Sequence, residues 1–582
     1  MKYEAQILEA YKKLGFQPRD RQVEAINEIV VSFLDEGITT ISLSAPTGTG
    51  KSIIGAVCAE VLHQIKNPDT HNNASFLLTG QNVLAQQYAD TFADQQNPYS
   101  TEFVIVAGAN NYECAALSTP TEIQTGEACS IGLFQKTGLT DLIENYCEGC
   151  EFKRMKSLRP QSRHLITNYS WYFVDRMYTQ MMEKRTLCVF DEAHLLNDLF
   201  VEHNAIYFSE RRIEKYVEEI SENLKLGNTE IFKMLKMIKE HLVAGKITSE
   251  NYRPYVTALC EIYNEVSGAA KLEADRCVKN AGQYLKMLKM HKKYFGLGCK
   301  IGDLLLFNYP CVFEYKEKDP KKGQAEHEAS VKAIFIGDMF SQLINADYNL
   351  LMSATISEKY LKQTMAIPGK TKHIRLAPSF PKENKQIVFY KTQSLNYETM
   401  KDKGVIEKLC RATADIVSHH TQMGDRGIIL CPSFAVAELL SNTARSLQIT
   451  KVFEHQRGTK LADVLEQFKC FSSGPAVLIT PSGFEGVDLP GDLSKYQIIV
   501  KMPFASLGDE RIKTILRLYP SIYGIIALKK VVQGAGRSVR SATDSAITYC
   551  LDSNIQRAWS KDNEWADEFS SRFSSTLQLI SD

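Results

Sequence analysis

The sequence lacks a long apolar run and an excess of either charge, and we expect no leader peptide. None of its 582 residues lies in an apolar run that approaches the roughly 20 residues needed by a membrane-spanning helix. The first residues, Met1 to Gln6, contain no apolar core of a secretory signal. We therefore expect no membrane contact and a reducing, cytoplasmic location. There the 14 cysteines are thiols or metal ligands rather than disulfides.

The sequence also lacks internal repeats, and its 68 basic residues balance 68 acidic ones. Bulk charge therefore gives no sign of a nucleic-acid partner. Two local stretches depart from this balance of charge. Residues 276–300 carry basic side chains and no acid, and residues 151–164 carry five basic side chains and one glutamate. Such stretches bind phosphate groups or form solvated helix faces, and the sequence leaves both interpretations open.

Two regions of the chain alternate short apolar runs with helical patterns. The runs lie at residues 40–43, 75–78, 103–106, 164–167 and 187–190, and then at 387–389, 428–430, 476–479, 498–500 and 546–549. Continuous apolar runs of this length are typical of strands buried on both faces of a parallel sheet. Between the two regions, residues 209–294 have helical periodicity and predict a helical insert.

A glycine-rich loop follows the first apolar run. Residues 44–52 are Ser-Ala-Pro-Thr-Gly-Thr-Gly-Lys-Ser. Gly48 and Gly50 allow the backbone to approach phosphate oxygens at the start of a helix, whose N-terminal dipole favours anions. We expect Lys51 to reach the β- and γ-phosphates of ATP and the Ser52 hydroxyl to bind Mg²⁺. Ala45 stands where the first glycine of such loops is usual.

An acidic motif follows the fifth apolar run, at Asp191-Glu192-Ala-His194. At the carboxyl end of a buried strand, Asp191 is placed to hold Mg²⁺ through water, and Glu192 to orient or deprotonate the attacking water. We expect His194 to couple this site to neighbouring motifs. Together with the glycine-rich loop, the motif predicts a site that hydrolyses ATP.

Further segments extend the pattern along the chain. They are Arg19-Asp-Arg-Gln22, residues 79–87, Ser353-Ala-Thr355, residues 483–488, and Gln533-Gly-Ala-Gly-Arg537-Ser-Val-Arg540. With four cysteines between the glycine-rich loop and the acidic motif, the combination resembles the XPD/DinG family of superfamily 2 iron–sulfur DNA helicases.

The resemblance implies roles for residues outside the two central motifs. Gln533 would sense the γ-phosphate, and Arg537 and Arg540 would be arginine fingers from the second domain, since phosphoryl transfer develops negative charge that a guanidinium stabilises. The expected catalytic residues are Lys51, Asp191, Glu192, Gln533, Arg537 and Arg540. The expected nucleotide-binding residues are Gln22, Thr47, Gly48, Thr49, Gly50, Lys51, Ser52 and Asp488, with Mg²⁺ on Ser52 and Asp191.

The four cysteines of the first region form a candidate metal site. Cys147 and Cys150 lie on one tight turn, and Cys114 and Cys129 lie upstream. Four thiolates suit either a [4Fe–4S] cluster or Zn²⁺, and spacing does not separate them. The resemblance implies the cluster. We expect it to stiffen a small insert that acts as a wedge where a duplex splits. Cys188 and Cys431 fall in apolar runs and are expected in the core.

The expected fold class is α/β, with two RecA-like parallel-sheet motor domains, an iron–sulfur insert and a helical arch-like insert. The boundaries expected are 1–108, 163–205 and 326–380 for the first motor domain, 109–162 for the iron–sulfur insert, 206–325 for the helical insert, and 381–582 for the second motor domain. We expect no nuclease domain ahead of the glycine-rich loop.

The expected function is an ATP-dependent DNA helicase that moves along single-stranded DNA, 5′ to 3′ by resemblance, and unwinds duplex junctions. It would act as a monomer, with DNA-repair or replication proteins as possible partners, and RNA remains open as the strand. The aromatic residues at 169 and 171–173 stack bases or belong to the core. The alternatives are a zinc-bearing ATPase that remodels without strand separation and a binding module that uses ATP as a latch.

Overall fold

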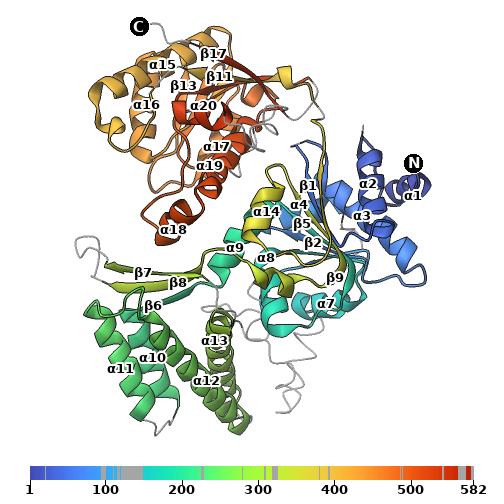
Figure 1. Ribbon diagram of the computed structural model, residues 1–582, viewed down its shortest axis with the longest axis vertical. Coiled ribbons are helices and arrows are strands. Elements are labelled where there is room, and N and C mark those ends of the chain that lie inside the picture. Colours follow the sequence, from blue (N-terminus) through green and yellow to red (C-terminus); the bar gives the residue numbers. More distant parts are fainter. Residues whose placement is uncertain are drawn as a thin grey trace.

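The computed structural model describes residues 1–578 except for 20, 47, 81, 93–99, 109–110, 115–117, 119–148, 225–228, 278–279, 307–309, 318–325, 379, 391–392, 485–486, 488, 490, 540–542 and 561–571. Figure 1 shows two α/β lobes and an arm. We call residues 1–205 and 334–376 the first lobe, residues 206–333 the arm, and residues 385–578 the second lobe.

The first lobe is built on a seven-stranded sheet of order β10-β1-β9-β5-β2-β4-β3, in which every pairing is parallel. Its strands are β1 (Thr40–Ser44), β2 (Ser75–Thr79), β3 (Phe103–Val106), β4 (His164–Asn168), β5 (Arg185–Asp191), β9 (Ala346–Ser353) and β10 (Thr371–Arg375). The five apolar runs of the first region all coincide with strands, so the predicted parallel sheet is confirmed.

Two helical layers cover this sheet. The helices are α1 (Glu4–Lys13), α2 (Gln22–Leu34), α3 (Lys51–Lys66), α4 (Asn82–Phe92), α7 (Glu151–Leu158), α8 (Tyr169–Val174), α9 (Leu196–His203) and α14 (Glu358–Thr364). In β2, Leu77 packs into one core with α1 to α3, while Phe76 and Leu78 pack into the other with α8 and α9. Successive strand residues point to opposite faces, which explains why the runs are continuously apolar.

The second lobe repeats the architecture with a seven-stranded sheet of order β13-β14-β12-β15-β16-β11-β17, again parallel throughout. Its strands are β11 (Lys385–Tyr390), β12 (Arg426–Leu430), β13 (Lys451–Glu454), β14 (Ala476–Thr480), β15 (Tyr496–Ile499), β16 (Ala546–Cys550) and β17 (Ser574–Gln578). Its helices are α15 (Lys403–Gln422), α16 (Phe434–Ser446), α17 (Leu461–Cys470), α18 (Glu510–Leu518), α19 (Pro520–Ala535) and α20 (Ser553–Ser560). The expected pair of α/β motor domains is therefore confirmed as a fold.

The arm contains the expected helices and a sheet that the sequence analysis did not anticipate. The helices are α10 (Glu210–Asn223), α11 (Thr229–Val243), α12 (Tyr252–Arg276) and α13 (Ala281–Leu306). Strands β6 (Ile206–Ser209), β7 (Cys311–Glu317) and β8 (His327–Ala333) form an antiparallel sheet of order β6-β8-β7. Because β8 pairs with β6, the arm extends past the expected boundary at residue 325.

The second lobe contacts both the arm and the first lobe through α18, which approaches β7 in Figure 1. The backbone N–H of Glu510 donates to Glu314 Oε1 of β7 at 3.3 Å. Arg511 donates to the carbonyl of Ile334 at 2.9 Å and to Asp198 Oδ1 at 2.8 Å. Asp509 caps α18 by accepting from the backbone N–H groups of Arg511 and Ile512. Across the described residues, no helix is long and apolar enough to span a bilayer.

Candidate nucleotide site

The glycine-rich loop connects β1 to α3, as the sequence predicts. Gly48 and Gly50 have φ values of +85° and +73°, which favour glycine. A Cβ on Gly50 would lie 2.6 Å from Nε2 of Gln22, so that position also lacks room for a side chain. Lys51 and Ser52 begin α3, and their position at the helix N-terminus suits phosphate binding. Thr47 lies outside the described residues.

Gln22 lies under this loop. Its side-chain amide donates to the carbonyl of Thr49 at 2.7 Å, while its Oε1 accepts from the Tyr11 hydroxyl at 2.8 Å and from the backbone N–H of Arg19 at 2.9 Å. The Arg19 guanidinium donates to the carbonyl of Gly48 at 3.1 Å. These contacts place Gln22 as a support of the loop, and its role toward adenine stays a prediction.

Asp191 is the last residue of β5 and lies opposite the start of α3. Its Oδ2 accepts from the Ser52 hydroxyl at 3.2 Å and from the Tyr88 hydroxyl at 2.7 Å. Burial raises the pKa of the Asp191 carboxyl, and the negative charge of Glu192 adds to that effect. A hydroxyl and a carboxylate oxygen at this separation fit a Mg²⁺ ion, which prefers oxygen ligands.

Glu192 follows Asp191 and lies between the side chains of Lys51 and His194. Its Oε1 lies 3.6 Å from Lys51 Nζ, and its Oε2 lies 3.2 Å from His194 Nδ1. Burial alone would raise its pKa, but Lys51 and His194 outweigh burial and lower the pKa to about 2. Its φ of +51° is rare for a residue with a side chain, and such strain is typical of functional positions.

His194 extends these contacts to the second lobe. Its Nδ1 lies 2.8 Å from the Ser353 hydroxyl, and its Nε2 lies 2.7 Å from Nε2 of Gln533 on α19. Gln533 also donates to the Thr355 hydroxyl at 3.4 Å. We call Lys51, Glu192, His194 and Gln533 the contact chain, because each contacts the next across the two lobes.

A pocket of about 350 Å³ lies beside the glycine-rich loop. Its described lining consists of Arg19, Gly48, Gly50, Lys51, Ser52, Gln87, Tyr88, Thr91, Phe92, Asp191 and Glu192, all from the first lobe.

The predicted residues of the second lobe lie at different distances from this pocket. Gln533 is connected to it through its contact with His194. Arg537 instead lies buried in the second lobe, where its guanidinium donates to the carbonyl of Val487. Arg540 and Asp488 lie outside the described residues.

Sequence analysis missed Tyr88. It stands one position beyond the motif at residues 79–87, and α4 carries it toward Asp191 because β2 and β5 are neighbours in the sheet. Burial raises the pKa of its hydroxyl, so Tyr88 remains a hydrogen-bond donor to the carboxylate. The position of Tyr88 directly after the motif at residues 79–87 is the sequence feature that could have indicated this role.

Comparisons with known proteins agree with this fold. Residues 15–229 match the family described as "Type III restriction enzyme, res subunit", and residues 416–573 match "Helicase C-terminal domain". The ATP-dependent DNA helicase YoaA of Escherichia coli (strain K12) is 32% identical over 139 residues, which cover 22% of this chain and 21% of YoaA. The solved structure titled "XPD_Helicase" covers 97% of this chain and all of its own, with a TM-score of 0.58 and 14% identity. The Xpd4 structure from S. tokodaii covers 97% and 100%, with a TM-score of 0.53 and 13% identity.

The two solved structures show that the chain shares the fold of those proteins. The two family matches each cover less than half of the chain, one from the first lobe into the arm and the other within the second lobe. The chain spans about a fifth of the length of YoaA.

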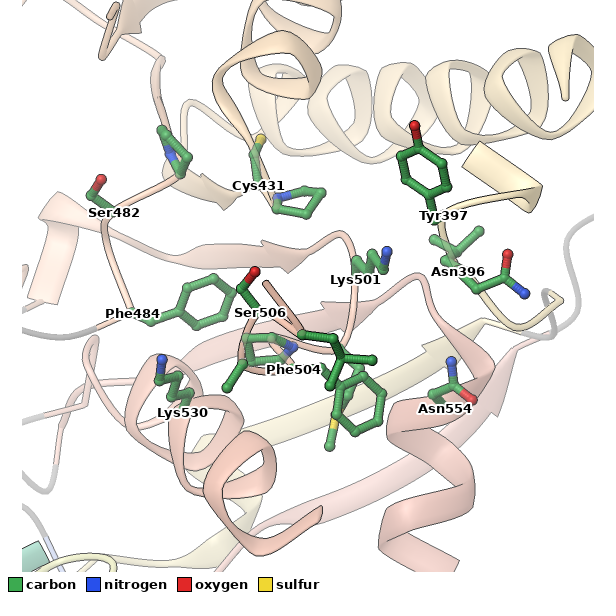
Figure 2. Close-up of a pocket in the computed structure, with 17 residues that line it drawn as sticks. Asn396, Tyr397, Cys431, Ser482, Phe484, Lys501, Phe504, Ser506, Lys530 and Asn554 are labelled. Atoms are coloured by element: carbon green, nitrogen blue, oxygen red, sulfur yellow. The ribbon is translucent and has the colours of Figure 1, made fainter. Parts of the chain in front are cut away.

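A second pocket, of about 900 Å³, lies in the second lobe. It opens at the carboxyl ends of the parallel strands, where α/β sheets commonly bind ligands. Figure 2 shows Asn396 and Tyr397 on one side and Ser482 and Phe484 on the other, with Phe504 between them. The side chains of Tyr397 and Phe504 are 75% and 40% exposed.

A buried carboxylate organises the loops of this second pocket. Asp552 follows β16 and accepts from the backbone N–H groups of Leu395 at 3.1 Å, Met502 at 2.9 Å and Asn554 at 2.9 Å. Leu395 and Met502 belong to two different loops and Asn554 to the first turn of α20, and all three residues line the pocket. Lys501 and Lys530 add two cationic side chains to the lining.

The aromatic cluster at the start of α8 belongs largely to the core. Tyr169, Tyr172 and Phe173 are fully buried, and their rings pack against Phe190 and Phe200. The core interpretation of these three residues is therefore confirmed.

Of the four predicted cysteine ligands, the structure describes Cys114 and Cys150. Cys129 and Cys147 lie outside the described residues. Among the described residues, no group of three or more His, Cys, Asp or Glu side chains is arranged to hold a metal ion. Cys188 and Cys431 are buried in the cores, as expected, and burial raises the pKa of both thiols.

Proposed function

We propose that this protein hydrolyses ATP at the first-lobe pocket and uses the reaction to move along single-stranded DNA and separate duplex strands. The contact chain carries this proposal. It supplies an uninterrupted set of side-chain contacts from the phosphate-binding lysine to the second lobe. Such a connection is what a motor needs in order to convert nucleotide state into movement between lobes.

In this proposal each residue of the pocket has one task. Lys51 and the loop N–H groups bind the phosphates. Ser52 and Asp191 would hold Mg²⁺, which neutralises phosphate charge when bound. Glu192 is ionised because its pKa is lowered to about 2, so it accepts a hydrogen bond from the attacking water and orients it.

The second lobe completes the site in the nucleotide-bound state. Gln533 is in contact with His194 and would report the γ-phosphate to α19. We propose that Arg537 and Arg540 turn toward the phosphates when nucleotide binds, because the developing negative charge requires cationic partners. This step requires Arg537 to leave the carbonyl of Val487.

The second-lobe pocket is the proposed contact for single-stranded DNA. Phe504 and Tyr397 are exposed aromatic rings for base stacking, and Lys501 and Lys530 are cations for the backbone phosphates. Asp552 fixes the loops that carry Met502 and Leu395, so the pocket is formed before a strand binds. The family resemblance supports 5′ to 3′ polarity.

We further propose that Cys114, Cys129, Cys147 and Cys150 hold a [4Fe–4S] cluster. The rings of Tyr112 and Phe152, two positions before Cys114 and two after Cys150, lie 5.5 Å apart. This contact brings the ends of the cysteine segment together. Cys150 also lies directly before the first residue of α7. These observations fit four-thiolate ligation, which would supply stability that the short segment lacks.

Strand displacement on 5′-tailed and 3′-tailed duplexes, together with ATP hydrolysis, tests the proposal. We expect single-stranded DNA to stimulate phosphate release and the 5′-tailed substrate to be unwound, with Lys51→Ala inactive in both assays. Absence of DNA-stimulated phosphate release from the native protein would sink the motor proposal. ATP hydrolysis without strand displacement would favour a remodelling ATPase. Stimulation by RNA and not by DNA would identify RNA as the strand along which the protein moves.

A variant of the second-lobe pocket tests the strand contact. Stacking on one aromatic ring contributes about 1–3 kcal/mol per base, so Phe504→Ala should weaken single-strand binding about tenfold or more. Met423→Ala removes an exposed apolar side chain of the second lobe that does not line the pocket and should leave binding unchanged. Equal losses in both variants would argue against a strand contact at this pocket.

A further inference from the structure

One arginine near the end of the described chain connects the two lobes, and sequence analysis gave it no role. Arg572 precedes β17, which pairs with β11 of the second lobe in the register Gln386 to Ser574. Its side chain nevertheless points into the first lobe. Nη2 donates to the Ser44 hydroxyl at 2.9 Å, and Nη1 donates to the carbonyl of Ala354. The residue is 5% exposed.

The two acceptors flank the nucleotide site. Ser44 is the last residue of β1 and the first of the glycine-rich loop. Ala354 follows β9, and Ser44 pairs with Ser353 in the register of those strands. The backbone N–H of Ala45 donates to the carbonyl of Ser353 at 3.0 Å, which fastens the two strand ends to each other. One guanidinium therefore spans both strand ends that enter the site.

The same strand end carries the contact chain. Ser353 contacts Nδ1 of His194, and the Thr355 hydroxyl accepts from Gln533. Arg572 donates to the residue between them. A shift of Ala354 relative to the second lobe would therefore displace its two neighbours. These neighbours contact His194 and Gln533, so the Gln533–His194 contact would be disturbed from both sides. Catalytic geometry is sensitive to displacements of this kind, because about 1 Å of misplacement can cost about a hundredfold in rate.

The shape of the arginine side chain matters for this contact. Its planar guanidinium presents several N–H groups in a fixed fork, so it donates to two acceptors at once in a defined direction. A lysine ammonium carries the same charge but lacks that geometry. The buried guanidinium also depends on its partners, since an unpaired buried charge is costly.

We propose that Arg572 is a positioning residue for ATP hydrolysis. It fixes the position of the ends of β1 and β9 relative to the second lobe, so that Gln533 contacts His194 when the site is assembled. This inference rests on the proposed ATPase and adds to it a residue that touches neither nucleotide nor DNA. Ser44 and Ala354 are its first-lobe partners.

Steady-state ATP hydrolysis with saturating single-stranded DNA tests the inference on the full-length protein. Arg572→Ala should lower kcat about tenfold or more while the KM for ATP changes by less than about threefold, because the phosphate-binding residues remain in place. Arg572→Lys should recover less than half of the loss. The control is Arg557→Ala, which removes an exposed arginine of α20 and should behave as the native protein does.

A double-mutant cycle separates positioning from folding. Ser44→Ala removes the hydroxyl acceptor, so its effect on kcat should be smaller in the Arg572→Ala background than in the native one. Strictly additive effects, a native kcat in Arg572→Ala, or full rescue by lysine would each overturn the inference. So would a loss of kcat that disappears when the variant is assayed well below its melting temperature. A native protein that hydrolyses no ATP would instead sink the proposed function itself.

Discussion

The side-chain amide nitrogen of Gln533 in the second lobe lies 2.7 Å from Nε2 of His194 in the first lobe. Because an amide N–H donates, the imidazole accepts at Nε2 and carries its hydrogen on Nδ1. That hydrogen faces both the Ser353 hydroxyl and the carboxylate of Glu192. His194 therefore connects the acidic motif of one lobe to a helix of the other.

Removal of either partner of this contact should uncouple the lobes. We expect Gln533→Ala and His194→Ala each to lower kcat for DNA-stimulated ATP hydrolysis about tenfold, and the double variant to lose little more, because both act through one contact. Rapid-quench or coupled-enzyme kinetics provide the measurement. Gln467→Ala, on an exposed face of α17, is the matched control. Multiplicative losses in the double variant would show that the two residues act separately.

Glu192 should be needed for hydrolysis and not for nucleotide binding. Glu192→Gln keeps the shape of the side chain but removes the charge that orients water, and general-base groups contribute about 100-fold to 10,000-fold. We expect kcat to fall in that range while a fluorescent ATP analogue still binds within about threefold of native affinity. A variant that loses binding instead would show that Glu192 mainly holds Lys51.

Tyr88 should affect the requirement for magnesium. Its hydroxyl donates to the same oxygen of Asp191 that accepts from Ser52, and a hydrogen bond to a charged group contributes about 1.5–3 kcal/mol. Tyr88→Phe should therefore raise the Mg²⁺ concentration for half-maximal ATP hydrolysis about tenfold. Tyr255→Phe removes a hydroxyl from the arm and should change nothing. An unaltered Mg²⁺ titration in Tyr88→Phe would exclude a role for this hydrogen bond at the metal site.

The first lobe should lose stability in acid through Glu60. Burial would raise the pKa of its carboxyl, but hydrogen bonds from His164 and Arg163 outweigh burial and hold the pKa far below its ordinary value of 4.5. The ionised form is thus favoured in the folded state, so its stabilisation is present above about pH 4.5 and is lost as the pH falls below that value.

Glu60→Gln measures that contribution. It removes the closer ionic partner of the buried Arg163 and leaves the longer pair with Glu102 at 3.9 Å, and breaking a buried pair costs about 3–5 kcal/mol. The melting temperature of the variant should lie well below that of the native protein at pH 7, and the difference should shrink at pH 4. A difference that grows in acid would contradict the assigned direction of the shift.

Cys150 should be required for the protein to bind iron. Cys150→Ser removes one proposed thiolate ligand, so iron and visible absorption should be lost in the variant while ATP binding is kept. Cys410→Ser in α15 of the second lobe is the control, and it should retain the iron. Stoichiometric zinc in the native protein would replace the cluster by a zinc site, and normal unwinding by the variant would count against a wedge role.

Local patterns predicted much of this molecule because they are set by neighbours in the chain. The apolar runs became strands, and Gly48 and Gly50 adopt the backbone angles that a phosphate loop requires. The acidic motif lies at the end of a buried strand, where Asp191 meets Ser52.

Contacts between distant segments were not predictable in the same way. The sheet of the arm joins β6 to β8 across four helices. Strand β6 is only four residues long, and β7 and β8 mix charged with apolar residues. The aromatic start of α8 suits either base stacking or the core in the sequence, and the fold buries Tyr169 and Tyr172 against Phe190. Burial depends on which layer lies above an element, and the local pattern does not contain that information.

The sequence by itself determined two α/β lobes, a phosphate loop and an acidic strand end, since hydrophobic periodicity and glycine backbone preferences act over a few residues. Only the tertiary structure decided that Gln533 meets His194, that Tyr88 meets Asp191 and that Arg572 joins two strand ends of the other lobe. Those pairs lie between about a hundred and more than five hundred residues apart in the chain. Strand order within the first lobe brings Tyr88 to Asp191, and the packing of one lobe against the other brings the other two pairs within hydrogen-bonding distance.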